Sequence, residues 1–186
     1  ERREEIPSGE EVDGMLSGFR RQYASKVSQG SRELYEKGLP ILTTYLYWFP
    51  GTFMLVERGL FHRAAHHYEE AREDFEKALA ENPAQPYALN GLSFVYKYLG
   101  NYEKALFYIK KAILYKDKEI SPVIYGDMGN LYLLLGDYDN AAQAYREYVS
   151  LAGKGAYQME MLAECLAKAG KVQVATEVLW EAYPAE

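Results

Sequence analysis

The chain has 186 residues and a mass of 21.3 kDa, which fits one domain or a short array of repeats. Its formal net charge of -6 argues against sequence-independent binding to nucleic acid or to an anionic membrane, because both need clustered Lys and Arg. The single cysteine, Cys165, excludes an intramolecular disulfide framework and a multi-cysteine metal site, and its apolar neighbours predict a buried, inert thiol.

The N-terminal segment 1–10, ERREEIPSGE, is expected to be a disordered, charged lead-in. Because the first residue is Glu1 and not Met, the chain is expected to be an excerpt or a processed form. A cytoplasmic location is favoured, and a signal or anchor ahead of Glu1 stays open.

Residues 11–51 are predicted to form a helical hairpin. An apolar residue recurs at every fourth position of VDGMLSGFRRQYASKV and makes a stripe of Met15, Phe19, Tyr23 and Val27. The hairpin is expected to cap the rest of the chain as a degenerate repeat, with Gly38 near the helix crossing. Two alternatives stay open, in which residues 39–49 fill a groove of this chain or contact a membrane or a partner.

The longest uncharged run, LPILTTYLYWFPGTFMLV at residues 39–56, is not expected to cross a membrane. It contains Pro40 and Pro50, and the second proline should end any helix near Phe49. The nine residues from Ile41 to Phe49 are too short to span a bilayer, which takes about 20 residues.

The remainder of the chain repeats with a period near 34 residues. Segments such as YEEAREDFEKALAENP and YEKALFYIKKAILYKD align so that Ala71, Ala105, Ala141 and Ala175 lie 34, 36 and 34 residues apart. Each segment follows a helical stretch and a turn, so the repeated unit is helix, turn, helix. One such hairpin cannot bury its own apolar face, and the units must therefore stack.

This pattern resembles the tetratricopeptide repeat family, whose first helix carries Leu, a small residue and an aromatic residue before a turn glycine. The second and third units match it at these positions: Leu92, Ser93, Tyr96 and Gly100; Met128, Gly129, Tyr132 and Gly136. The resemblance implies an all-α, right-handed solenoid of helical hairpins with an N-terminal helical extension. Its units are expected at 52–85, 86–121, 122–155 and 156–186.

The side chains expected to fill the space between the paired helices are large and apolar or aromatic. They are Phe75, Tyr96, Ile109, Tyr132, Tyr145 and Leu179. The first unit departs from the family pattern, with Arg58 for the leucine, His62 for the aromatic residue and His66 for the turn glycine. Tyr148 takes the place of a small residue and predicts a locally wider junction.

Two sets of polar residues raise a catalytic or metal-binding alternative. His62 and His66 share one helix face near Glu70, but Arg63 stands where a zinc protease needs its glutamate, so a hydrolase or metal protein is the least favoured hypothesis. Asp127, Glu160 and Glu164 could be glycosidase carboxylates, although they also fall on positions that the repeat family turns toward its groove. No catalytic residue, cofactor or metal is assigned, and the chain is not expected to be an enzyme.

The resemblance implies a concave groove lined by fixed positions of each first helix. The expected lining is Phe53, Leu60, Tyr87, Asn90, Phe94, Lys97, Tyr98, Asp127, Asn130, Leu133, Tyr157, Glu160 and Glu164. Tyr87, Phe94 and Tyr98 would be apolar anchors, and Asn90 and Asn130 would bond a peptide backbone. The basic clamp with which some family members hold chaperone carboxylates is absent.

The function favoured by these residues is a non-enzymatic scaffold or adaptor that binds a peptide segment of a partner protein. The expected segment has apolar anchors and a neutral or basic character. The alternative is a bacterial secretion chaperone of the type III kind, which co-expression with a secreted translocator would test. A homodimer through Trp180 and Tyr183, or through residues 45–49, stays open.

Overall fold

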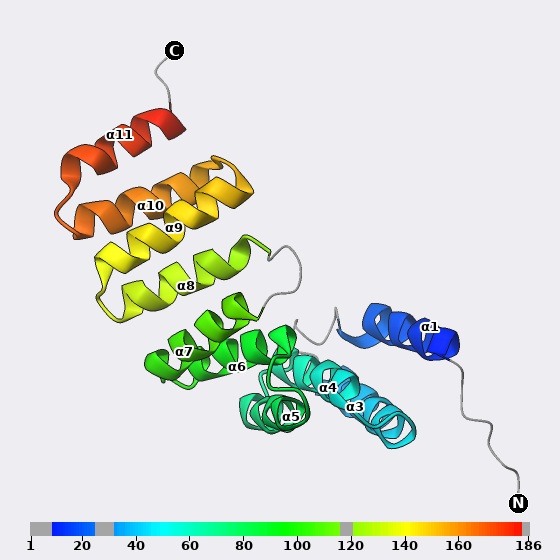
Figure 1. Cartoon of the computed structure of the whole chain (residues 1–186). Helices are drawn as coiled ribbons and strands as arrows, with labels where there is room; N and C mark the ends of the chain where they lie inside the picture. The colour runs from blue at the N-terminus through cyan, green and yellow to red at the C-terminus, as the bar shows by residue number, and fades with distance from the viewer. Residues whose placement is uncertain (1–8, 25–31, 116–120, 184–186) are drawn as a thin grey trace, which may run out of the picture. The chain divides into compact units, whose positions relative to one another are not determined.

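The computed structural model of the chain describes residues 9–24, 32–115 and 121–183, and every element in these ranges is a helix (Figure 1). This confirms the predicted all-α class for the described residues. The chain forms two compact units, residues 1–95 and residues 96–186, which are taken separately below.

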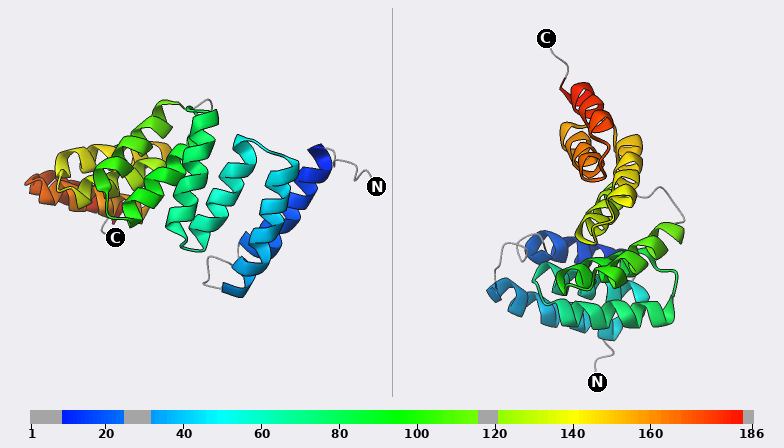
Figure 2. Two further views of the ribbon diagram at one scale, coloured as in Figure 1. Left: turned by 90° about the horizontal axis from the view of Figure 1, so that it is seen from below. Right: turned by 90° about the vertical axis from the view of Figure 1, so that its left-hand side faces the viewer.

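Unit 1 consists of helices that follow one another along the chain, and most of these helices run side by side (Figure 2). The helices are α1 (Gly9–Phe19), the π-helical turn η1 (Arg20–Ala24), α3 (Arg32–Trp48), α4 (Thr52–Ala64), α5 (Tyr68–Glu81) and α6 (Pro86–Tyr98), whose last residues belong to unit 2. The predicted lead-in 1–10 lies mostly outside the described residues, and α1 begins within it at Gly9.

The N-terminal helices pack on α4 through an apolar cluster that includes Leu16, Phe19, Leu42 and Phe61. Phe19 and Tyr23 of the predicted stripe do pack in this cluster, but Met15 was placed wrongly, since it is 38% exposed whereas the neighbouring Leu16 is 1% exposed. Leu16 lies three residues before Phe19, so the two share a helix face on which Leu16 takes the place predicted for Met15. Val27 lies outside the described residues.

Gly38 lies at a close contact between α3 and α4, as its predicted place near the crossing requires. A Cβ atom added at Gly38 would come within 2.7 Å of the Phe61 ring. Only glycine therefore allows the two helices to approach this closely at that point.

Pro40 had been expected to interrupt a helix in the uncharged run, but helix α3 continues through it. The helix ends at Trp48, just before Pro50, as predicted. Proline at position 40 removes one backbone bond within the helix. The Thr44 hydroxyl donates to the Pro40 carbonyl at 2.8 Å, and Thr43 makes the same contact to Leu39 at 2.9 Å. No helix among the described residues is both long enough and apolar enough to cross a membrane.

A buried polar cluster joins α3, α4 and α5. Both oxygens of the Asp74 carboxylate accept hydrogen bonds from Arg58, each at 2.7 Å, and Asp74 is only 2% exposed. His62 Nδ1 lies 2.6 Å from the Tyr35 hydroxyl, while its Nε2 lies 3.6 Å from an Asp74 oxygen. Two departures of the first repeat, Arg58 and His62, therefore have a common cause, because a carboxylate buried on α5 requires polar partners on α4.

Unit 2 consists of helical hairpins stacked in chain order. Its helices after α6 are α7 (Tyr102–Leu114), α8 (Val123–Leu134), α9 (Tyr138–Ala152), α10 (Ala156–Lys168) and α11 (Val172–Ala182), and each contacts the next. The helices α7 and α9 begin at side-chain caps, in which Asn101 accepts from the Lys104 amide and Asp137 from the Asn140 amide.

The recurring alanines lie at the closest points of packing, as the period predicts. Ala71, Ala105 and Ala141 have no exposed surface, and Ala175 is 4% exposed. The larger predicted core side chains are also buried, with one exception. Leu179 is 38% exposed, because within the described residues no further helix follows α11 to cover this side chain.

The Tyr148 ring is accommodated by a glycine on the neighbouring helix. A Cβ atom added at Gly126 of α8 would lie 2.8 Å from the ring of Tyr148 on α9. The room for the Tyr148 ring therefore arises because Gly126, opposite it, has no side chain. The repeat pattern alone does not predict this.

Candidate functional site

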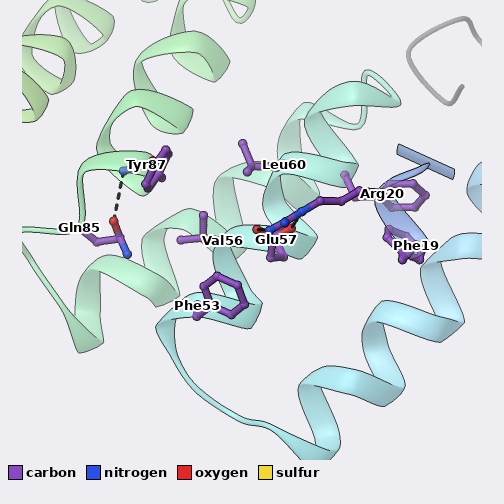
Figure 3. A pocket seen from close by; sticks show the side chains of 9 residues that line it. Phe19, Arg20, Phe53, Val56, Glu57, Leu60, Gln85 and Tyr87 are labelled. Carbon is purple, nitrogen blue, oxygen red and sulfur yellow. Dashed lines mark hydrogen bonds and ion pairs between the residues drawn. The ribbon is translucent and has the colours of Figure 1, made fainter. Parts of the chain in front are cut away.

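A cavity of about 520 Å³, here called the α4 cavity, lies over the face of α4 in unit 1 (Figure 3). Its floor comes from residues of α4 spaced three or four apart, with the end of α1 on one side and the start of α6 on the other. The lining is Phe19, Arg20, Phe53, Val56, Glu57, Leu60, Phe61, Gln85 and Tyr87.

The α4 cavity is mostly apolar, and apart from Gln85 and the Tyr87 hydroxyl its polar groups are one charged pair. Arg20 Nε donates to Glu57 Oε2 at 3.0 Å, and a second guanidinium nitrogen donates to the other carboxylate oxygen. This bidentate contact raises the pKa of Arg20. Phe53 and Tyr87 are 50% and 69% exposed, so two aromatic rings are accessible from solvent at this site.

A second cavity of about 450 Å³, the α8 cavity, lies in unit 2. Its lining is Lys97, Tyr98, Tyr102, Asn130, Leu133 and Leu134, from the end of α6, the start of α7 and the second half of α8. The Lys97 amino group lies 5.6 Å from the centre of the Tyr98 ring, and Tyr98 is 54% exposed. The site therefore combines an accessible ring with a cation beside it.

Asn130 is held in place from behind the α8 cavity. The hydroxyl of the fully buried Tyr145 donates to Asn130 Oδ1 at 2.8 Å, and burial raises the pKa of this hydroxyl. The hydroxyl is thus a permanent donor near neutral pH and fixes the orientation of the amide. The Nδ2 group of Asn130 can then donate to a carbonyl oxygen of a bound chain.

The structure brings together about half of the predicted groove residues. Phe53, Leu60 and Tyr87 line the α4 cavity, and Lys97, Tyr98, Asn130 and Leu133 line the α8 cavity. The others line neither of these cavities: Asn90, Phe94, Asp127, Tyr157, Glu160 and Glu164.

Three of these others make contacts of their own. The Phe94 ring lies under the Arg63 guanidinium at 4.7 Å, the Glu164 carboxylate bonds Lys168 at 2.6 Å, and the Glu160 carboxylate accepts from Tyr183. Local partners therefore engage Glu160 and Glu164, two of the three carboxylates that had suggested a glycosidase.

The cavities also contain residues that the repeat pattern did not select. Phe19 and Arg20 come from the N-terminal helices, Gln85 precedes α6, and Tyr102 begins α7. The available signal was the prediction that residues 11–51 form a degenerate repeat, because the first helix of such a repeat should also contribute to a groove.

The predicted metal alternative finds no constellation in the described part of the chain. His62 faces Tyr35 and Asp74. His66 lies in the turn after α4 with a φ of 64°, and its Nδ1 atom lies 2.8 Å from the Tyr68 hydroxyl. No group of three or more His, Cys, Asp or Glu side chains suited to a metal ion occurs among the described residues. Cys165 is buried as predicted, and burial raises its pKa to about 11, so the thiol stays protonated and unreactive.

Comparison with known families identifies the repeats. Two family models, both described as tetratricopeptide repeat, match residues 62–123 and 123–154, which together make half of the chain. The chain belongs to the tetratricopeptide repeat family. Membership supports a scaffold for protein–protein interaction, and the family is generally non-enzymatic.

Solved tetratricopeptide repeat structures share the fold at low sequence identity. MamA 41-end from Desulfovibrio magneticus RS-1 is 16% identical, with 96% of this chain and 100% of that chain covered and a TM-score of 0.72. YrrB, described as a TPR protein with an unusual peptide-binding site, is 18% identical over 77% of this chain and 75% of its own, with a TM-score of 0.68. No curated protein matches the sequence.

Proposed function

We propose that the chain is a non-enzymatic adaptor whose first helices bind a peptide segment of a partner protein. In this proposal the repeats are residues 52–85, 86–121, 122–155 and 156–186, and residues 11–51 form a degenerate repeat ahead of them. YrrB, a protein of the same fold, is described as having a peptide-binding site, which supports binding of this kind.

The observation that carries the proposal is the arrangement of the α8 cavity. An exposed tyrosine, an apolar floor and a fixed side-chain amide meet in about 450 Å³, enough for one or two side chains of a peptide. In this arrangement Tyr98 packs against an apolar side chain of the segment, and Asn130 donates to a backbone carbonyl. The interaction needs no enzymatic group and no cofactor.

The partner segment proposed here carries apolar anchors and a neutral or basic character. The chain has a net charge of -6, so a basic segment is attracted and a strongly acidic one is repelled. This preference is a matter of long-range electrostatics and weakens as salt is added.

Titration of a partner segment against cavity variants tests the proposal. Partners are isolated by affinity purification, the bound segment is narrowed to a synthetic peptide, and its affinity is measured for each variant. Tyr98→Ala and Asn130→Asp should each weaken binding by about tenfold or more, as hot-spot side chains do. Asn130→Asp removes the donors but keeps an acceptor for Tyr145, so the fold is preserved.

Tyr115→Ala is the matched control, because Tyr115 is an exposed tyrosine of unit 2 that does not line the α8 cavity. Its affinity should equal that of the unaltered chain. Equal affinities for all of the variants would remove the α8 cavity from the account.

A further inference from the structure

The α4 cavity holds the carboxylate of Glu57 among apolar side chains, which do not stabilise a negative charge. The side chain of Glu57 is only 13% exposed, and its neighbours on the cavity floor are Val56, Leu60 and Phe61. It is the one carboxylate in the lining of this cavity. A charge in such a place requires a cation, because the apolar lining cannot replace the water that the carboxylate has lost.

The cation comes from a distant part of the sequence. Arg20 lies 37 residues before Glu57, at the point where α1 gives way to the π-helical turn η1, and its side chain is 50% exposed. Figure 3 shows the guanidinium lying over Glu57 between the two walls of the cavity. A half-exposed partner loses little solvation energy in this contact and can return to water easily.

We infer that Arg20 occupies a subsite for a basic side chain of a peptide bound at the α4 cavity, and that such a side chain displaces Arg20 from Glu57. The inference rests on the proposed peptide-binding function and adds the chemistry of the peptide and a means of regulation. The contact between Arg20 and Glu57 is then a weak intramolecular inhibitor of the α4 cavity.

The cavity specifies a peptide of defined chemistry. An arginine satisfies Glu57 best, because its planar guanidinium can reproduce the bidentate contact that Arg20 makes, whereas lysine offers a single ammonium group. Phe53 and Tyr87, with half or more of their surface exposed, receive a large apolar residue of the same peptide. A glutamate at the basic position would meet the Glu57 carboxylate and be rejected.

Competition by Arg20 also sets the size of the regulatory effect. Because Arg20 is half-exposed and regains water when it leaves Glu57, its contact with this mostly buried carboxylate reduces the apparent affinity of a basic peptide by only a small factor. Removal of the Arg20 side chain should raise the affinity for such peptides by roughly three- to fivefold.

The experiment is a synthetic peptide array probed with the full chain. Each peptide carries one large apolar residue and, at varied spacing from it, one position occupied by arginine, lysine, norleucine or glutamate. The array is read with the unaltered chain, Arg20→Ala, Glu57→Gln, Tyr98→Ala and Arg32→Ala, and binding of the best arginine peptide is then measured in solution. Arg32→Ala is the matched control, since Arg32 pairs within α3 with Glu36.

The expected result is a preference for arginine over norleucine, raised three- to fivefold by Arg20→Ala, abolished by Glu57→Gln and unchanged by Arg32→Ala. Peptide binding that depends on Tyr98 but has no arginine preference would overturn this inference and leave the proposed function standing. Absence of binding to every peptide would overturn both. Thermal unfolding of each variant establishes that it is folded, and Arg20→Lys, which keeps the charge, should retain most of the inhibition.

Discussion

At the scale of single residues, His62 shows how tertiary context changes the role of a repeat position. The family pattern places an aromatic side chain there, and His62 does lie buried, 6% exposed, but as part of a polar cluster. Its charged or titratable neighbours are Tyr35 of α3, Arg58 of α4, Glu70 and Asp74 of α5, and His67. The pKa of Tyr35 is raised to about 12, mainly by burial, so its hydroxyl stays protonated.

Acid should weaken the packing of the N-terminal helices. Burial is the main cause that lowers the pKa of His62, with Arg58 also lowering it and Asp74 opposing. The unfolded chain then binds a proton at His62 more readily than the folded chain, so the free energy of unfolding falls as pH drops below the unfolded-state pKa of 6.5. Denaturant unfolding measured from about pH 7.5 to about pH 5, on both sides of 6.5, should record this decrease in the free energy of unfolding.

The control for this pH dependence is His62→Gln, which keeps a polar side chain in the cluster but cannot titrate. The decrease of the unfolding free energy below pH 6.5 should be smaller in this variant. An identical pH dependence in both proteins would mean that other groups cause it.

At the scale of helices and turns, the repeat period determined most of what could be predicted. Gly100, Gly136 and Gly170 end their first helices with φ of 77°, 75° and 78°, the left-handed conformation expected of turn glycines. His66 takes the same place in the first hairpin with φ of 64°, although it carries a side chain. The register of the turn is therefore stronger than the preference of the residue that occupies it.

His66→Gly should stabilise the chain by up to about 1 kcal/mol, because glycine adopts a left-handed conformation without the steric cost paid by other residues. The hydrogen bond lost to Tyr68 is exposed and weak. Thermal or denaturant unfolding measures the change.

Gly100→Ala provides the opposite test at an equivalent turn and should destabilise the chain by about 1 kcal/mol or more. A His66→Gly variant less stable than the unaltered chain would indicate that the histidine side chain contributes more than its backbone strain costs.

The candidate site was predictable only where it follows the repeat. Tyr98, Asn130 and Leu133 could be selected because their positions recur on each first helix, and they do line one cavity. Arg20 could not, since its contact with Glu57 depends on how the N-terminal helices pack on α4. The wrong placement of Met15 has a similar origin, because either Met15 or Leu16 could join Phe19 on the buried face when the partner helix is unknown.

At the scale of the whole molecule, the account joins the family, the charge and the cavities. The chain is a tetratricopeptide repeat protein with a net charge of -6, and each of its two units has a cavity lined by first-helix side chains. Within the described residues these features favour binding of another polypeptide over catalysis. The central claim is that the first-helix faces, and not the outer faces of the second helices, receive that polypeptide.

The most direct measurement is a comparison of amide ¹H–¹⁵N spectra of the full chain with and without a bound partner peptide. The account predicts shifted or broadened signals for residues at the α8 cavity, in particular Tyr98, Asn130 and Leu133, with smaller changes at Lys110 and Arg146 on the second helices. Changes confined to α11 and the second helices, with the cavity signals unmoved at saturation, would contradict it.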